Sequence, residues 1–236
     1  MYPYCSIRQV LKERASIVIC LLTLLVGTPS ILSATVANSV EILPPESNPY
    51  GLMYEQHVEK FWKWVLPLPK DLNPWDDQTG EKCANGQSES NSTVFYLSGN
   101  GGGKSDRTCK IPAGKGLFIP VSPMEISDKE APNSSVEQLH SIAKSDQDSV
   151  TSLYLKIDDK EYNREDLRGF RTDTGDFEVI FPKNAIFGAS EGPSKVVADG
   201  YYVITEPLEK GNHTVVYKAT LSLPFAMDIT YNIIAE

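Results

Sequence analysis

The last third of the chain is a series of short segments in which apolar and polar residues alternate. Residues 153–157 and 177–181 show this pattern most clearly, and turn-forming pairs such as Asp158-Asp159 and Gly211-Asn212 separate such segments. Alternation with a period of two is typical of strands that bury one face and expose the other. Short strands joined by tight turns favour antiparallel pairing. The pattern therefore predicts antiparallel β structure in this part of the chain.

The rest of the chain adds further predicted strands and two predicted helices. The other segments rich in β formers are residues 93–97, 108–111, 116–121, 201–205, 215–219 and 228–234. Apolar residues recur at helical spacing over residues 50–66 and again after Pro132, where Ser134 and Glu137 can form a capping box. We expect a mainly β fold, an antiparallel, jelly-roll-like β-sandwich with an N-terminal aromatic helix and one further short helix.

The first predicted helix has a wide apolar face. Trp62, Trp64 and Leu66 extend its apolar arc beyond what one flat sheet face can cover. Three things can bury the remaining rings: the following loop with Trp75, another chain, or a ligand. Aromatic rings also stack on sugars, so Trp64 and Trp75 are candidate ligand-binding residues.

The N-terminus has the pattern of an export signal. Basic residues precede an apolar run over residues 15–26, and small residues follow up to Ala37. This order is typical of a secretory signal peptide, and we expect cleavage after Ala37, with Ala34 as the alternative site. The apolar run is shorter than the roughly 20 residues of a spanning helix; an uncleaved membrane anchor is the competing interpretation. The expected organisation is a signal peptide over 1–37, an extended leader over 38–49 and a single secreted β-rich domain over 50–236.

Two cysteines are left once the signal peptide is removed. Cys83 and Cys109 are expected to form one disulfide, because a lone pair in an exported chain is most often bonded. Three acceptor patterns for N-glycosylation, at Asn91, Asn133 and Asn212, agree with a glycoprotein that is secreted or on the cell surface.

The charge of the chain argues against one class of partner. The sequence has 22 Lys and Arg against 31 Asp and Glu, a net charge of −9. A chain this acidic gains nothing from counterion release on phosphates, so we expect no nucleic-acid partner. The glycine-rich residues 99–103 lack the spacing of a phosphate-binding loop and predict a flexible hairpin tip. The acidic residues between Asp71 and Asp77 depart from the calcium-loop pattern, so we expect no metal and no other cofactor.

The components of common catalytic sites are sparse. The chain has three histidines, far apart in sequence, and neither a helical zinc motif nor a nucleophile elbow is present. Glu125, Asp128 and Glu130 cluster after the strand predicted over residues 116–121, where a loop can present carboxylates. Because glycosidases use a pair of carboxylates, Glu125 is a third candidate ligand-binding residue. We nevertheless favour a protein without enzymatic activity and identify no catalytic residue.

Several short motifs together resemble a family of uncharacterised secreted proteins from soil bacteria and archaea. The motifs are the tryptophan-rich helix after Tyr50-Gly51, Asn73-Pro74, Thr79-Gly80, Cys83, Gly86-Gln87, Arg107-Thr108-Cys109, residues 111–115 and 118–120, Asp199-Gly200-Tyr201-Tyr202 and Asp228-Ile229-Thr230-Tyr231. The similarity covers roughly residues 50–235. The family has no assigned activity, so the resemblance implies export, a disulfide and a β-sandwich and supplies no catalytic residue.

These features favour a secreted or cell-surface module for binding or interaction. Carbohydrate is one candidate ligand, and the sequence identifies neither the ligand nor a cell-surface partner. We expect no membrane span in the mature chain. The alternative is an extracellular hydrolase of the carboxylate-based glycosidase type.

Overall fold

The computed structural model describes residues 40–87, 92–222 and 224–236. The chain divides into two units, Met1–Ala37 and Asn38–Glu236, and every described residue belongs to the second. The predicted signal peptide, its cleavage site and the acceptor Asn91 therefore lie outside the described residues.

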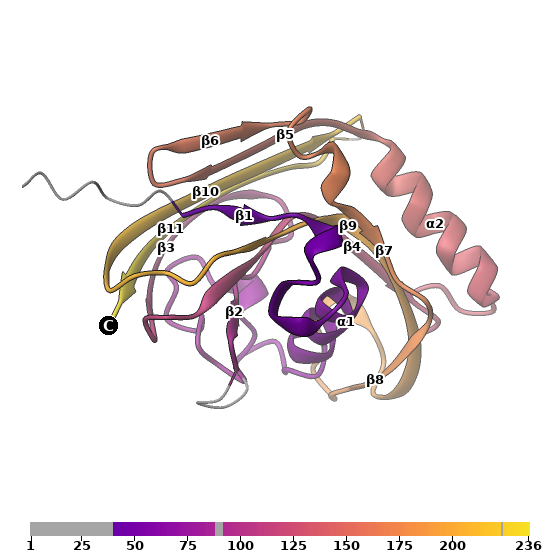
Figure 1. The fold of residues 1–236 in the computed structure, drawn as a ribbon. Coiled ribbons are helices and arrows are strands. Elements are labelled where there is room, and N and C mark those ends of the chain that lie inside the picture. Colours follow the sequence, from indigo (N-terminus) through magenta and orange to yellow (C-terminus); the bar gives the residue numbers. More distant parts are fainter. Residues whose placement is uncertain (1–39, 88–91, 223) are drawn as a thin grey trace, which may run out of the picture. The chain divides into compact units, whose positions relative to one another are not determined.

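The described residues form eleven strands in two sheets, whose arrangement Figure 1 shows. Sheet A contains β1 (Ile42–Leu43), β2 (Val94–Tyr96), β4 (Gly116–Ser127), β7 (Arg171–Asp173), β8 (Phe177–Phe181) and β9 (Gly192–Thr205). Sheet B contains β3 (Gly103–Ile111), β5 (Val150–Ile157), β6 (Lys160–Asn163), β10 (Gly211–Leu221) and β11 (Ala226–Ala235). The order is β1-β9-β4-β2 in sheet A, where β7 and β8 also pair with β9, and β3-β11-β10-β5-β6 in sheet B. Residues of both sheets share one hydrophobic core in a sandwich-like arrangement.

Both sheets are mixed, which corrects the expectation of purely antiparallel pairing. β2 runs parallel to β4 and β3 runs parallel to β11, whereas the other pairings are antiparallel. The reason lies in the glycine-rich residues 99–103, for which a hairpin tip was predicted. They connect β2 in sheet A to β3 in sheet B, so they cross between the sheets. Parallel partners need such crossovers, because a tight turn joins only antiparallel neighbours.

The N-terminal segment joins the domain. Residues 42 and 43, within the predicted leader, form β1 and pair with the end of β9. Single turns of 3₁₀ helix fill several connections: η1 (Pro45–Ser47), η2 (Pro49–Gly51), η3 (Pro74–Asp76), η4 (Arg168–Phe170) and η5 (Ile186–Gly188).

The aromatic helix α1 (Tyr54–Val65) packs on sheet A. Phe61 stacks on Phe118 of β4 with ring centroids 5.1 Å apart, and the indole N–H of Trp62 donates to the hydroxyl of Tyr202 at 3.1 Å. Trp64 lies on the other side of Phe61, stacked on Tyr96 of β2 with centroids 5.6 Å apart. The wide apolar arc of the helix is therefore covered by protein on every side that carries a ring.

The second helix, α2 (Val136–Asp148), covers part of β4 and β9. Leu139 and Ala143 pack with Val197 in a small core of their own. The capping box lies one residue later than predicted, because Ser135 and Gln138 form it. The helix also continues beyond its apolar stripe to Asp148. Its last turn therefore lies near the end of sheet B.

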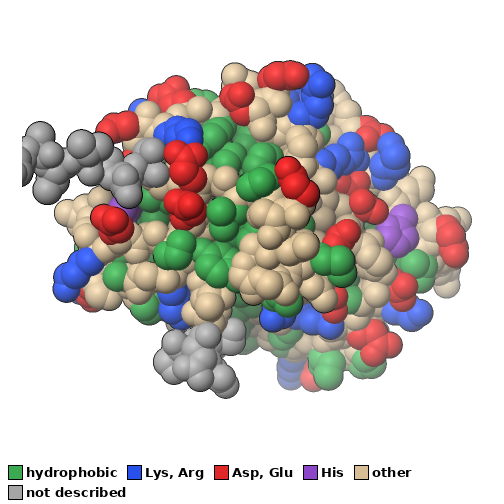
Figure 2. Space-filling view, viewed as in Figure 1, with side chains coloured by type: hydrophobic (Ala, Val, Ile, Leu, Met, Phe, Trp, Pro, Cys, Tyr) green, Lys and Arg blue, Asp and Glu red, His purple; other side chains and the backbone are tan. Residues whose placement is uncertain are grey.

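The disulfide between Cys83 and Cys109 is confirmed, with a Cα–Cα distance of 6.1 Å. Within the described ranges, no helix has the length and apolar character to cross a membrane. Asn133 and Asn212 are exposed, and their modification stays a prediction. Figure 2 shows acidic and basic side chains scattered over one face, without a large patch of a single sign. The disulfide is compatible with an extracellular protein.

Candidate ligand-binding pocket

A pocket of about 370 Å³ lies along the second half of β4. β2 pairs with β4 only over Gly116 to Phe118, so residues 122–127 of β4 have β9 as their one partner among the described strands. Pro123 suits this position, because proline is tolerated at a sheet edge. The pocket, called the β4 pocket below, is lined by Trp62, Trp75, Asn100, Gly101, Ser122, Pro123, Met124, Glu125, Ile126, Glu130, Asp146, Gln147, Phe187, Leu221, Phe225 and Met227.

Glu125 is the buried acidic side chain of this strand. Met124 and Ile126 on either side of it pack against the small core under α2, so alternation along the strand directs Glu125 to the opposite face. Its side chain is 5% exposed, and neither carboxylate oxygen has a hydrogen-bond partner among the described residues. Burial raises the pKa of Glu125 well above its usual value of 4.5, and the nearby charge of Glu130 raises it further.

Glu125 and Glu130 form a pair of interacting carboxyl groups. Repulsion between their negative charges favours a state in which one of the two carboxyls keeps a proton. Burial raises the pKa of Glu130 as well, although the Ser127 hydroxyl, which donates to it at 2.5 Å, acts in the opposite direction. The pair therefore titrates as a unit that holds one shared proton over a range above the usual carboxyl pKa.

The last turn of α2 supplies two more polar groups to the pocket, Asp146 and Gln147. Burial raises the pKa of Asp146, and the charge of Asp199 adds to this effect, whereas the amide of Gln147, which donates to Asp146 at 3.3 Å, lowers it. The Oε1 atom of Gln147 is buried without a partner among the described residues.

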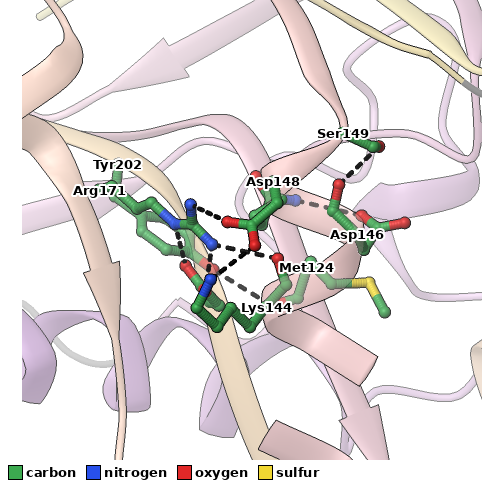
Figure 3. A network of polar contacts seen from close by, with 9 residues as sticks. Met124, Lys144, Asp146, Asp148, Ser149, Arg171 and Tyr202 are labelled. Atoms are coloured by element: carbon green, nitrogen blue, oxygen red, sulfur yellow. Dashed lines mark hydrogen bonds and ion pairs between the residues drawn. The ribbon is translucent and has the colours of Figure 1, made fainter. Parts of the chain in front are cut away.

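An arginine holds this end of α2 against sheet A (Figure 3). Arg171 of β7 donates through Nε and Nη2 to both carboxylate oxygens of Asp199 on β9, at 2.9 and 2.8 Å. Through Nη1 it also donates to Asp148 at 2.7 Å, and through Nη2 to the carbonyl of Lys144 at 3.2 Å. Because two-point carboxylate contacts fix direction as well as distance, Arg171 positions the helix end that carries Asp146.

Aromatic rings form the opposite wall. Trp75 in η3 lies 5.6 Å from Trp62 between ring centroids, and Phe187 meets it edge-on at 5.1 Å with an interplanar angle of 90°. The glycine-rich crossover permits this packing, because a Cβ atom at Gly99 would lie 2.8 Å from Cη2 of Trp75. The indole N–H of Trp75 is buried and has no acceptor among the described residues.

Phe187 has an unusual backbone conformation. Its φ of 61° lies in the left-handed region, which bulky residues rarely adopt. The ring is nevertheless 42% exposed and lines the pocket. Strained residues of this kind cluster at binding sites, where the surrounding structure holds them in place.

Arg107 of β3 fixes the loops behind the pocket. Its guanidinium donates to the hydroxyl of Tyr231 at 2.8 Å and to the carbonyls of Asp77, Ser98 and Gly99 at 2.7, 2.6 and 3.1 Å. These carbonyls belong to the loop that follows Trp75 and to the crossover that supports its ring. Arg107 thus positions the aromatic wall without lining the β4 pocket.

Of the three candidate ligand-binding residues from the sequence, Glu125 and Trp75 line the β4 pocket together and Trp64 does not. Trp64 is 8% exposed, and its indole N–H donates to the carbonyl of Asn85 at 2.8 Å. The sequence interpretation did not include Phe187 or Asp146 among the candidates. Asp146 follows the apolar stripe of α2 by three residues, and extending the predicted helix by one turn would have placed it at the helix end.

Comparisons with known proteins leave the function open. No protein-family model matches the chain, and no curated protein matches it. A solved structure, the "Solution Structure of Amebosin", is 9% identical over 56% of this chain and 96% of that chain, with a TM-score of 0.18. A score this low does not indicate a shared fold.

Proposed function

We propose that the domain is an extracellular binding module and that its ligand occupies the β4 pocket. One observation carries the proposal. The buried side-chain polar atoms that lack a partner among the described residues include Nε1 of Trp75, both carboxylate oxygens of Glu125 and Oε1 of Gln147, and all three residues line this pocket. Buried polar groups in folded proteins are almost always hydrogen-bonded, so a set of unpaired ones in one cavity suggests that a ligand completes them.

The dimensions and lining of the pocket support the same proposal. Its volume of about 370 Å³ falls within the range of small-molecule sites, and most of its lining is apolar with a few convergent polar groups. The extracellular location is supported by the disulfide. Membership of the secreted family that the motifs resemble is part of this proposal.

The indole N–H of Trp75 provides a direct test. The chain has three tryptophans and therefore three indole signals in a ¹H–¹⁵N spectrum. We would titrate the domain with choline, benzylamine, glucose, N-acetylglucosamine and cellobiose. A ligand in the β4 pocket is expected to move the Trp75 signal and to leave that of Trp64, which is bonded to Asn85, unchanged.

A pocket-filling variant separates binding in the β4 pocket from binding elsewhere. A Cβ atom at Gly101 would meet only Nε1 of Trp75, at 4.0 Å, so Gly101→Leu adds bulk beside the indole from a position that accepts a side chain. Gly175→Leu is the matched control, because a Cβ there meets nothing within 4 Å and Gly175 does not line the pocket. The proposal is rejected if no probe moves the Trp75 signal, or if Gly101→Leu leaves the shift as large as in the control.

Carboxylate-based hydrolysis is the second candidate. Its support is that burial raises the pKa of Glu125, as the pKa of a general acid must be raised, while Asp146 lines the same pocket. Glu125 and Glu130 contact each other, whereas the two carboxyls of a glycosidase are about 5–9.5 Å apart, so Asp146 would be the second catalytic group. Release of nitrophenol from nitrophenyl glycosides, abolished in both Glu125→Gln and Asp146→Asn, is the expected result. No release by the wild type rules out this activity on these substrates.

A further inference from the structure

We propose that the β4 pocket selects a small organic cation, whose ammonium group lies between the carboxyl groups and the aromatic rings. The inference rests on the proposed function and names the class of ligand. Four features of the pocket lead to it: the sign of its charge, the arrangement of its carboxyls, the packing of its rings and the excess of unpaired acceptors.

The charge of the pocket is negative. Glu125, Glu130 and Asp146 line it, and none of the described lining residues is a Lys, Arg or His. Two carboxyls that share one proton still carry one negative charge between them. Arg107 is the buried cation behind the aromatic wall, but its donors are directed to carbonyls and to a tyrosine hydroxyl, away from the carboxyl groups.

The carboxyls are too dispersed for a metal ion. Within the described residues, no group of three or more His, Cys, Asp or Glu is arranged to hold one. An ammonium group on a carbon framework is larger than a metal ion and does not need all its partners within one coordination sphere. Three carboxyls that line one pocket without forming a metal site therefore suit an organic cation better than a metal ion.

Three aromatic rings pack against one another at one side of the pocket. Trp62 and Trp75 are tilted by 35° to each other, and Phe187 stands at 90° to Trp75. A sugar stacks on a flat exposed ring, but Trp62 and Trp75 are only 1% and 6% exposed. A ring that borders a cavity attracts an ammonium group placed over its face through cation–π attraction, and this needs no broad exposed surface.

The unpaired polar atoms match a ligand that mainly donates hydrogen bonds. A bound cation favours the ionised form of Glu125. In that form Glu125 and Gln147 offer three acceptor oxygens without donors, whereas Trp75 offers the one unpaired donor of the lining among the described residues. A primary or methylated ammonium group carries positive N–H or C–H hydrogens and no acceptor, which fits this excess.

Two pairs of probes isolate the charge. Choline is compared with 3,3-dimethyl-1-butanol, its uncharged analogue of similar shape, and benzylamine is compared with benzyl alcohol. Dissociation constants come from titration calorimetry at pH 7.5 and from the shift of the Trp75 indole signal. In at least one pair, the cation is expected to bind about tenfold or more tightly than its neutral partner.

Matched variants assign the selectivity to named side chains. The double variant Glu125→Gln, Glu130→Gln removes the charge of the pair and is expected to reduce the preference for the cation below about threefold. The control is Glu178→Gln on the exposed face of β8. Phe187→Ala is expected to weaken cation binding about fivefold or more, and Ile180→Ala, at a side chain that is 69% exposed and outside the lining, is expected to have no effect.

The outcomes distinguish this inference from the proposed function. If a sugar or a neutral analogue binds in the β4 pocket as tightly as the cations, the cation inference is wrong while the binding function stands. If the preference survives the double Glu variant, the carboxyl pair is not its source and the inference is also wrong. If none of the probes moves the Trp75 signal, both proposals are rejected.

Discussion

Arg107 and Glu125 are both buried side chains that can carry a charge, yet their surroundings differ. Arg107 is 1% exposed and directs its N–H groups to four backbone carbonyls and the Tyr231 hydroxyl. Glu125 is 5% exposed, and neither of its oxygens meets a donor among the described residues. Protein groups therefore compensate the charge of Arg107 in full. The carboxyl of Glu125 has no such partners, so its protonated, neutral form is favoured.

This difference separates a structural role from a binding role. A buried charge with all its hydrogen bonds made can hold a fold together, because breaking any one of them leaves an unpaired buried group. A buried carboxyl without donors lowers the stability of the folded state, so its presence in a well-packed core points to a use outside folding. The following substitutions test this separation, from the largest expected effect to the smallest.

Arg107→Met is expected to be the most damaging change. It leaves the carbonyls of Asp77, Ser98 and Gly99 buried without their donor, and we expect a loss of about 3–5 kcal/mol in the free energy of unfolding. Urea denaturation measures it, with Arg168→Met on the exposed side chain of η4 as the control at under about 0.5 kcal/mol. A loss below about 1 kcal/mol would show that the loops hold their positions without Arg107.

The disulfide anchors the same region, since Cys109 lies two residues after Arg107 on β3. Replacing both cysteines by serine frees a loop whose ends are 26 positions apart, and the chain-entropy relation predicts a loss of about 3 kcal/mol. The same urea experiment on oxidised wild type and on the double variant tests it. Equal unfolding free energies would mean that Arg107 alone fixes the loop.

Tyr231→Phe removes one partner of Arg107. The hydroxyl accepts from Arg107 at 2.8 Å and from the backbone N–H of Ser98 at 3.1 Å. Two buried donors lose their acceptor while the guanidinium keeps its carbonyl partners, so we expect a loss of about 1–3 kcal/mol. A loss as large as that of Arg107→Met would contradict the view that the carbonyls carry most of the interaction.

Glu125→Gln is expected to change stability least and to change its pH dependence most. The pKa of Glu125 is higher in the folded state than in the unfolded state, so the stabilising contribution is complete below pH 4.5 and is lost as the pH rises toward the folded-state pKa. Wild type should therefore lose stability relative to the variant between pH 4 and pH 8. Urea midpoints across this range test the sign. A variant that loses stability relative to wild type as the pH rises would refute the raised pKa.

Most strands were predictable because their signal is local. The alternation in residues 153–157 and 177–181 matches β5 and β8 closely, and the aromatic helix was found from its spacing. The pairing of the strands was less predictable. It depends on whether the connection after a strand stays in the same sheet or crosses to the other sheet. The glycine-rich residues 99–103 read as a hairpin tip, yet they cross between sheets, and this one connection makes β3 a neighbour of β11.

The candidate site was predictable only in part for a related reason. Glu125 and Trp75 were singled out by residue type, but nothing in the sequence shows that they line one pocket. Phe187 and Phe225 come from distant connections, and the left-handed φ of Phe187 has no reliable sequence signature other than the glycine that follows it. In the sequence, Arg107 looks like an ordinary surface arginine. Its partners are mostly backbone carbonyls, and these leave no recognisable pattern of side chains in the sequence.

The position of β11 in sheet B constrains the order in which the protein can assemble. β11 follows every other described element and lies between β3 and β10. Gly103 of β3 can therefore pair only after Met227 of β11 has been synthesised. Until β11 arrives, β3 has no strand partner among the described elements, and β10 has one open side. Sheets that depend on contacts between distant segments form slowly and expose their edges meanwhile. A chain emerging from a ribosome or a translocation channel would therefore remain open to aggregation until its last strand is released, and a product cut short before Ala226 would leave both edges unpaired.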